Sequence, residues 1–203
     1  MVRRLPGAAH TAQPWLIHEI AGDFALEDVW EMPAPGGGPD DFPVLLAVFD
    51  GGLREQASAP TKALFWLRLK LGSVLRLDRG SRGLGARVPS LRERLPAEVR
   101  DATPDKQLNK NADFTLVYER ENERAMEIAN GTMHGILHLG WVPDGRGGWR
   151  GQLAVLVKPN GRAGSAYMAF IKPFRHLIVY PALGRVWERH WRQLTETGRL
   201  DKG

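Results

Sequence analysis

The sequence predicts a single α+β domain in which an antiparallel sheet is closed by a long C-terminal helix. Three observations indicate this fold. Residues 114–158 have the pattern of consecutive strands joined by tight turns, residues 163–191 return to helical spacing, and no alternation of strands with helices appears. At 203 residues, 43% of them hydrophobic, the chain can fill one core. We therefore expect one domain over residues 1–203, with a flexible N-terminal stretch at residues 1–11.

The strands are predicted from alternating apolar side chains and from the turn residues between them. The run from Pro143 to Gly148 (PDGRGG) has the composition of a hairpin turn, and Pro159-Asn160-Gly161 has that of a second tight turn. Strands joined in this way run antiparallel. The expected strands cover residues 13–21, 114–120, 124–130, 132–142 and 149–158.

Two shorter helices are expected between the first strand and the strand series. Asp40 and Asp41 offer N-cap oxygens to a helix that ends near Gly51-Gly52. Its apolar side carries Phe42, Leu45, Leu46 and Phe49. A second helix is expected over residues 60–75, where leucines recur at helical spacing.

The C-terminal helix, residues 163–191, is expected to turn Tyr167, Phe170 and Phe174 towards the sheet. Pro173 and Pro181 each remove a backbone hydrogen-bond donor. They should therefore bend this helix, unless one of them begins a separate helix.

The composition excludes several classes of protein. The chain has no Cys, which rules out disulfide frameworks, thiolate nucleophiles and Cys-ligated metals. The N-terminus lacks the apolar core of a secretory signal, and no apolar run approaches the roughly 20 residues of a membrane span. We therefore expect a cytoplasmic protein with no membrane partner.

The net charge of +5 leaves anionic partners open. The densest basic stretch, Arg76 to Arg94, is rich in Gly and could hold a phosphate or carboxylate, although a solvated loop is the favoured interpretation. Seven Trp could stack on bases, but most fall within apolar periodic segments. Core or cavity lining is therefore favoured over nucleic-acid binding.

His134 and His138 have the spacing of a metal-binding pair on a helix. On a strand, however, the same spacing separates them by roughly 13 Å. We favour the strand, so no metal site is expected. The side with Leu137, Leu139 and Trp141 is the more apolar and should face the core or cavity, which leaves the histidines on the outer face, against a dimer partner or the N-terminal segment.

The candidates for proton transfer are Tyr118, His134 and His138. Tyr118 could offer its hydroxyl to a ligand carbonyl, or it could be a core residue with a satisfied hydroxyl. A histidine could act as a general acid or base if both faces of its strand are buried. Glu119 and Glu127 are expected to pair with Arg at the surface.

Three stretches resemble a known family: Gly85 to Arg92 (GARVPSLR), Asn130 to Val142 (NGTMHGILHLGWV), and Val157 to Gly161 continuing to Ile171 to His176 (IKPFRH). Together they resemble the bacterial family called domain of unknown function 2867. That family is similar to the START and polyketide-cyclase superfamily. The resemblance implies a helix-grip fold, in which a curved antiparallel sheet wraps around the C-terminal helix.

The resemblance also implies a function, because that superfamily mostly binds hydrophobic or aromatic molecules between sheet and helix. We expect the cavity for such a ligand to be lined by Trp66, Tyr118, Trp141, Tyr167, Phe170 and Phe174, with Arg87 near the mouth of the cavity. One alternative is a cyclase or isomerase that uses Tyr118 or His134. Another is a homodimeric regulatory module that pairs through the histidine face. No cofactor is expected, since no G-x-G-x-x-G follows a strand.

Overall fold

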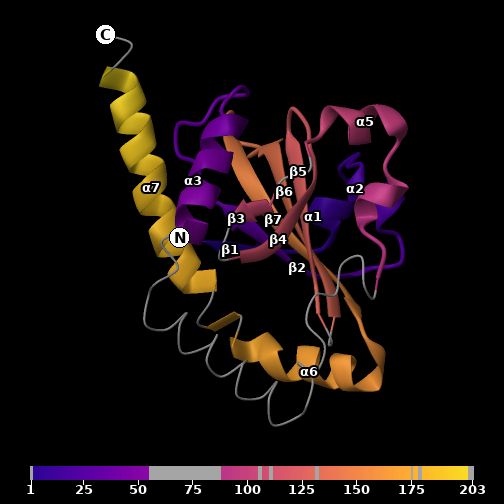
Figure 1. Cartoon of the computed structure of the whole chain (residues 1–203). Coiled ribbons are helices and arrows are strands. Elements are labelled where there is room, and N and C mark those ends of the chain that lie inside the picture. The colour runs from indigo at the N-terminus through magenta and orange to yellow at the C-terminus, as the bar shows by residue number, and fades with distance from the viewer. Residues whose placement is uncertain are drawn as a thin grey trace.

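The structure is a computed structural model that describes residues 2–54, 88–104, 107–109, 112–130, 133–174, 176–177 and 180–200 (Figure 1). Within these ranges helices and strands are mixed, which confirms the predicted α+β class. The helix predicted over residues 60–75, with Trp66, and the part of the basic loop that carries Arg87 lie outside the described residues. No helix in the described ranges is long and apolar enough to cross a membrane.

The described strands form one open antiparallel sheet in the order β1-β2-β7-β6-β5-β4-β3. From β4 to β7 each strand pairs with the next one along the chain, which confirms the predicted strand series. β2 pairs with β7, so the first long strand lies beside the last. The strands are β1 (Arg3–Leu5), β2 (Ala25–Met32), β3 (Gln107–Asn109), β4 (Ala112–Glu119), β5 (Glu123–Ala129), β6 (Met133–Pro143) and β7 (Trp149–Pro159).

The turn between β6 and β7 is the one that its residues predict. Gly145 and Gly147 adopt φ values of 76° and 89°, which glycine reaches without steric cost. The Asp144 carboxylate accepts hydrogen bonds from the backbone N–H groups of Arg146 and Gly148, at 2.7 and 3.0 Å. These two bonds lower the pKa of Asp144. The turn therefore pairs Pro143 with Trp149 and sets the register of the longest hairpin.

Helices cover both faces of the sheet (Figure 1). The helix predicted after Asp41 is confirmed, and it runs at least to Arg54 rather than ending at Gly51-Gly52. The helices are α1 (Ala8–Thr11), α2 (Ile17–Ile20), α3 (Phe42–Arg54), the 3₁₀ turn η1 (Leu91–Arg94), α5 (Ala97–Ala102), α6 (Gly161–Phe174) and α7 (Tyr180–Leu200).

The C-terminal segment is helical, as predicted, but forms two helices. α6 ends directly after Pro173, and α7 begins directly before Pro181. Proline lacks a backbone N–H, so it fits the first turn of a helix and disrupts the interior. Residues 176–177, between the two helices, have π-helical geometry, so Pro173 and Pro181 flank an irregular part of the C-terminal segment.

The strand predicted over residues 13–21 is wrong. Residues 17–20 form α2 instead, because a helical turn brings Ile17 and Ile20 to the same buried side, whereas a strand would send them to opposite faces. The first long strand is β2, which the sequence analysis did not identify. Residues 1–11 were expected to be a flexible stretch, but β1 and α1 lie within them, and His10 is buried.

The two faces of the sheet bury separate hydrophobic clusters. We call one the α7 face: Trp30, Leu139 and Leu153 pack there against α3 and α7. We call the other the N-terminal face, because α1, α2 and η1 cover it, and Ile136 and Ala154 belong to its core. The odd-numbered side of β6 faces α7, as its apolar character predicts, and the histidine side faces the N-terminal segment. Both faces of this central strand are therefore covered by protein.

Candidate functional site

One row of side chains on the α7 face is incompletely covered. The register places Asp28, Val155, Leu137 and Met126 side by side across β2, β7, β6 and β5. Val155 and Met126 are buried, whereas Leu137 between them stays partly accessible although it lies on a central strand. Cross-strand neighbours are about 5 Å apart, so this accessible apolar surface is roughly 10 Å from Asp28.

Asp28, at the end of this row, is a fully buried carboxylate on β2, just after an irregularity in the pairing of β2 with β7 between Leu26 and Asp28. Nε2 of His176 lies 2.6 Å from its Oδ1, and the Tyr180 hydroxyl donates to its Oδ2 at 3.3 Å. The Arg4 guanidinium is 3.9 Å away. A buried charge is tolerated only when it is paired and hydrogen-bonded, so these partners stabilise it. Residues from both ends of the chain thus meet at one carboxylate.

Aromatic rings surround this carboxylate. Trp30 stacks on Tyr180 with ring centroids 4.3 Å apart, and the His176 imidazole lies 5.7 Å from Trp30. The side chain of His176 is 20% exposed, so its ring can be reached from outside. The buried indole N–H groups of Trp30 and Trp187 have no hydrogen-bond partner in the described part of the chain. The site combines aromatic surface, a polar imidazole and indole donors, the set that apolar ligand pockets use for orientation.

The N-terminal face carries a second polar cluster, centred on Glu123. Its carboxylate receives the Tyr118 hydroxyl at 2.7 Å, the Leu16 backbone N–H at 3.1 Å and Nε2 of His138 at 3.0 Å. His138 Nδ1 in turn lies 3.1 Å from Nε2 of His10. These side chains form one chain of hydrogen bonds from Tyr118 through Glu123 and His138 to His10.

The environment fixes the charge of this cluster. Burial works to raise the pKa of Glu123, but the hydrogen bonds from His138, Tyr118 and Leu16 outweigh it, and the pKa is lowered. Burial lowers the pKa of His138, although Glu123 works against this. Burial, then Glu123, raises the pKa of Tyr118. At neutral pH, Glu123 is therefore ionised, and His138 is neutral with its proton on Nε2.

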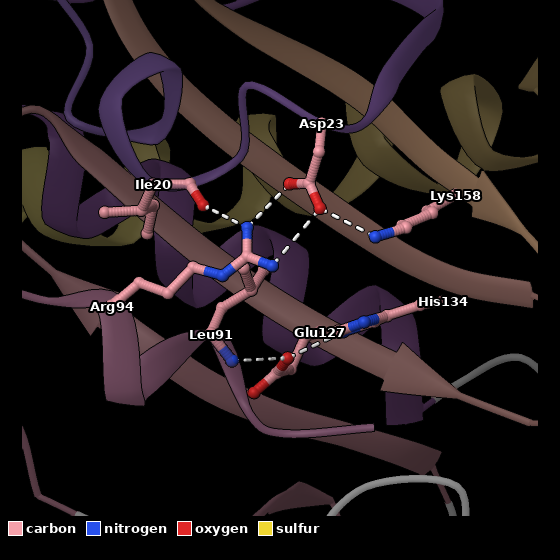
Figure 2. A network of polar contacts seen from close by, with 7 residues as sticks. All are labelled: Ile20, Asp23, Leu91, Arg94, Glu127, His134 and Lys158. Atoms are coloured by element: carbon pink, nitrogen blue, oxygen red, sulfur yellow. Dashed lines mark hydrogen bonds and ion pairs between the residues drawn. The ribbon is translucent and has the colours of Figure 1, made fainter. Parts of the chain in front are cut away.

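A third cluster lies four residues further along β5, at Glu127 (Figure 2). One carboxylate oxygen lies 2.8 Å from Nε2 of His134 and accepts the Leu91 backbone N–H at 3.1 Å. The other accepts the Ser90 hydroxyl. Glu127 is fully buried, so the prediction that it pairs with Arg at the surface is wrong.

Beside this cluster, Arg94 holds η1 against the end of α2. Its guanidinium donates to the Ile20 carbonyl at 2.9 Å and pairs with Asp23 at 2.6 Å, and Lys158 pairs with Asp23 at 2.8 Å (Figure 2). At this end of the basic stretch Arg94 therefore lies in a 3₁₀ turn and has structural partners, whereas the favoured interpretation was a solvated loop.

The hairpin register explains both Glu–His pairs. Glu127 lies opposite Ile136 and Glu123 opposite Gly140, so each histidine is the diagonal neighbour of one carboxylate on the same face. His134 therefore contacts Glu127, and His138 contacts Glu123. Among the described residues, no group of three or more His, Asp or Glu is placed to hold a metal ion.

The predicted site residues are divided between the two faces. Tyr118, His134 and His138 lie on the N-terminal face, and Trp141 lies on the α7 face. Phe170 is 51% exposed, so the prediction that it packs on the sheet is wrong for this residue. Tyr167 and Phe174 are part of α6, and the orientation of their side chains stays a prediction.

The family model described as "Protein of unknown function (DUF2867)" matches residues 20–182. The chain belongs to this family. The match includes Asp28, Trp30, His176 and Tyr180, and it begins after His10. Comparison with curated proteins and with solved structures finds no match. The family match therefore covers these four residues of the α7-face cluster, but not Arg4 or Trp187, and only part of the cluster around Glu123.

Several residues of these clusters in the DUF2867 chain escaped the sequence analysis. No local pattern singles out Asp28, because Glu27 beside it suggests an exposed segment and its partners His176 and Tyr180 lie at the other end of the chain. The pairing of the two Glu–His pairs follows from E-x-x-x-E and H-x-x-x-H on two strands of one hairpin once the register is known. No local pattern brings His10 to His138, because 128 residues separate them.

Proposed function

We propose that this protein binds a small hydrophobic or aromatic molecule on the α7 face, between the row from Asp28 to Leu137 and the junction of α6 with α7. The observation that carries the proposal is the partly accessible Leu137 on a central strand, in the same cross-strand row as the buried carboxylate of Asp28 that contacts an imidazole. The apolar row would hold the body of the ligand, and His176 would contact its polar end.

The arrangement of the chain supports a helix-grip interpretation of this site. β2 pairs with β7, the strands from β4 to β7 follow as hairpins, and α6 and α7 come last. Met168 on α6 and Tyr180, Trp187 and Trp191 on α7 all join the core of the same face. We infer that the sheet and these helices enclose the ligand as in START-like and polyketide-cyclase-like domains.

The ligand proposal is tested with 8-anilinonaphthalene-1-sulfonate, an aromatic probe whose fluorescence rises in apolar surroundings. We expect saturable binding to the intact chain at neutral pH. Replacing His176 by Ala should weaken binding about tenfold or more, the effect of losing one charge-assisted hydrogen bond. His190→Ala is the matched control on α7 and should leave the affinity within about twofold. The absence of saturable binding, or equal losses in both variants, contradicts the proposal.

Leu137→Phe separates an open site from a filled core. In an open site the larger ring occupies the ligand's space, so probe binding is lost while the melting temperature changes by only a few degrees. In a filled core the same change overpacks the sheet and destabilises it by about 1–3 kcal/mol. Thermal unfolding with and without the probe distinguishes the two, and a large loss of stability contradicts an open site.

A second candidate function is proton transfer, as in a cyclase or isomerase. The observation that favours it is the His176–Asp28 contact: a neutral imidazole that donates from Nε2 to Asp28 presents the lone pair of Nδ1 to a ligand. In this proposal Nδ1 removes a proton from a carbon next to a carbonyl and returns it. Phenylacetone in D₂O should then exchange its α-hydrogens for deuterium, as NMR can follow. Equal exchange with His176→Ala contradicts it.

A further inference from the structure

The segment from Gly7 to Ala21, here called the clasp, covers the N-terminal face. It contains α1, α2 and the link between them. Trp15, Leu16, Ile17 and Ile20 are buried in the core of this face. The indole of Trp15 lies directly over Gly140, where an added Cβ would come within 2.7 Å of the ring. The clasp therefore fits closely on the strands beneath it.

Polar contacts join the clasp to the sheet at three points. His10 contacts His138, the Leu16 N–H donates to Glu123, and Gln152 donates to the Ala9 carbonyl at 3.2 Å. The first contact has a special requirement. Two ring nitrogens 3.1 Å apart form a hydrogen bond only if one carries a proton and the other a lone pair. Since His138 donates to Glu123 from Nε2, its Nδ1 accepts, and Nε2 of His10 is the donor.

The charged and titratable groups around His10 are unfavourable to a second proton. From the sheet it faces His138, behind which lie Glu123 and Tyr118, and from α2 it faces His18, with ring centroids 4.8 Å apart. Arg120 approaches Glu123 at 3.4 Å from the turn after β4, and Glu19 on α2 is exposed. Glu123 is thus the one carboxylate in this described cluster. It already accepts hydrogen bonds from Tyr118, the Leu16 N–H and His138.

We propose that the clasp is a pH-sensitive cover, in which protonation of His10 and His138 breaks their shared hydrogen bond and releases residues 7–21 from the sheet. Protonated rings would turn two N–H groups towards each other and place positive charges beside His18. Release uncovers the Glu123–His138 pair, which His10 and Leu16 contact in the closed structure. It also removes one wall of a pocket of about 390 Å³, which Trp15 of the clasp lines together with Arg120, Glu123 and Trp149.

The titration of His10 supports this direction. Burial, then His138 and His18, lowers its pKa to about 3 in the closed structure. In the released clasp the imidazole returns to about 6.5, so the open form binds protons first as the pH falls. Closure is therefore fully favoured above pH 6.5 and weakens below it. For His10 alone the ratio of open to closed clasp approaches a tenfold rise per pH unit below pH 6.5, which amounts to about 50-fold between pH 6.5 and pH 4.5.

Hydrogen–deuterium exchange of the intact chain, corrected for intrinsic exchange rates, tests the proposal. We expect the opening equilibrium of residues 7–21 to rise about 50-fold between pH 6.5 and pH 4.5, while β6 stays protected. His10→Phe keeps the ring but cannot titrate, so its clasp should open much less steeply with pH. His190→Phe is the matched control and should behave like the unmodified chain.

A variant that disturbs the packing of the clasp on the sheet gives a second test of the proposal. Gly140→Val should displace Trp15 and raise exchange in residues 7–21 at neutral pH, because its added carbon atoms clash with the indole. The proposal is overturned if this variant leaves the clasp protected, if the exchange of residues 7–21 does not depend on pH, or if His10→Phe keeps the full dependence. Simultaneous loss of protection in the clasp and in β6 is global acid unfolding, and it overturns the proposal as well.

Discussion

Replacing Glu127 by Leu is expected to lower the free energy of unfolding by about 3–5 kcal/mol. The carboxylate accepts from the Ser90 hydroxyl and the Leu91 backbone N–H, and it lies 2.8 Å from His134 Nε2 (Figure 2). Leucine removes all of these acceptor sites at once. The donors are buried or half-buried, so they would be left without compensation from water, and each such group costs about 1–3 kcal/mol.

Urea unfolding followed by circular dichroism measures this effect. Glu127→Gln retains one acceptor oxygen, so its loss of stability should lie between those of the wild type and Glu127→Leu. Glu121→Leu changes an exposed side chain in the same region and should stay within about 0.5 kcal/mol of the wild type. If Glu127→Leu were as stable as Glu121→Leu, the buried pair on β5 and β6 would have no structural role.

Replacing Trp141 by Ala is expected to cost about 3–5 kcal/mol, because it leaves a large cavity in the α7 face. The indole is 1% exposed, and the ring centroids of Trp149 and Trp191 lie 6.3 and 5.9 Å from its own. Its N–H donates to the Gly38 carbonyl at 3.0 Å. Its six-membered ring also lies so close to Gly37 that an added Cβ there would come within 3.0 Å. Trp141 thus packs as a core residue.

Trp149→Ala is the matched comparison, because Trp149 stacks on Trp141 but is only partly buried. It should cost clearly less, since less apolar area leaves water when it folds. Chemical unfolding of both variants measures the two losses of unfolding free energy, which can then be compared. Equal costs would contradict the core role of Trp141, and a Trp141→Ala variant that keeps full stability would support a ligand cavity around this residue instead.

The strand series from β4 to β7 could be read from the sequence because its signals are local. Side chains alternate along each strand, and the residues from Pro143 to Gly148 specify the turn. The signals for the two C-terminal helices are equally local, since large apolar residues recur every three to four positions. Pro181 could only be interpreted as a bend or a start, because its effect depends on where the helix begins.

The first strand was misplaced because apolar spacing is ambiguous in short segments. Over residues 13–21 the pattern suits both a strand and a helical turn, and contact with the sheet decides in favour of the turn. β2 was missed because Glu27, Asp28 and Glu31 suggest an exposed segment. Asp28 is nevertheless buried, since His176 and Tyr180 reach it from the other end of the chain.

The faces of β6 were assigned correctly, but the chemistry of the histidine face was not. Alternation alone shows that His134 and His138 share a side, and it cannot show what covers that side. The cover is the N-terminal segment, and the partners of the histidines are Glu127 and Glu123 on the neighbouring strand. Polar residues on a strand are ordinarily exposed, so burial of four of them on one face depends on contacts that are distant in sequence.

The pairing of β2 with β7 also determines when the fold can form during synthesis. Met32 pairs with Gly151, so the ribosome must add more than a hundred residues before β2 meets its partner. At ordinary elongation rates this delay is on the order of ten seconds. Through that interval Trp30 and Met32 lie on an unpaired strand edge, the kind of surface on which nascent chains aggregate. A chain that stopped before residue 151 would never cover them.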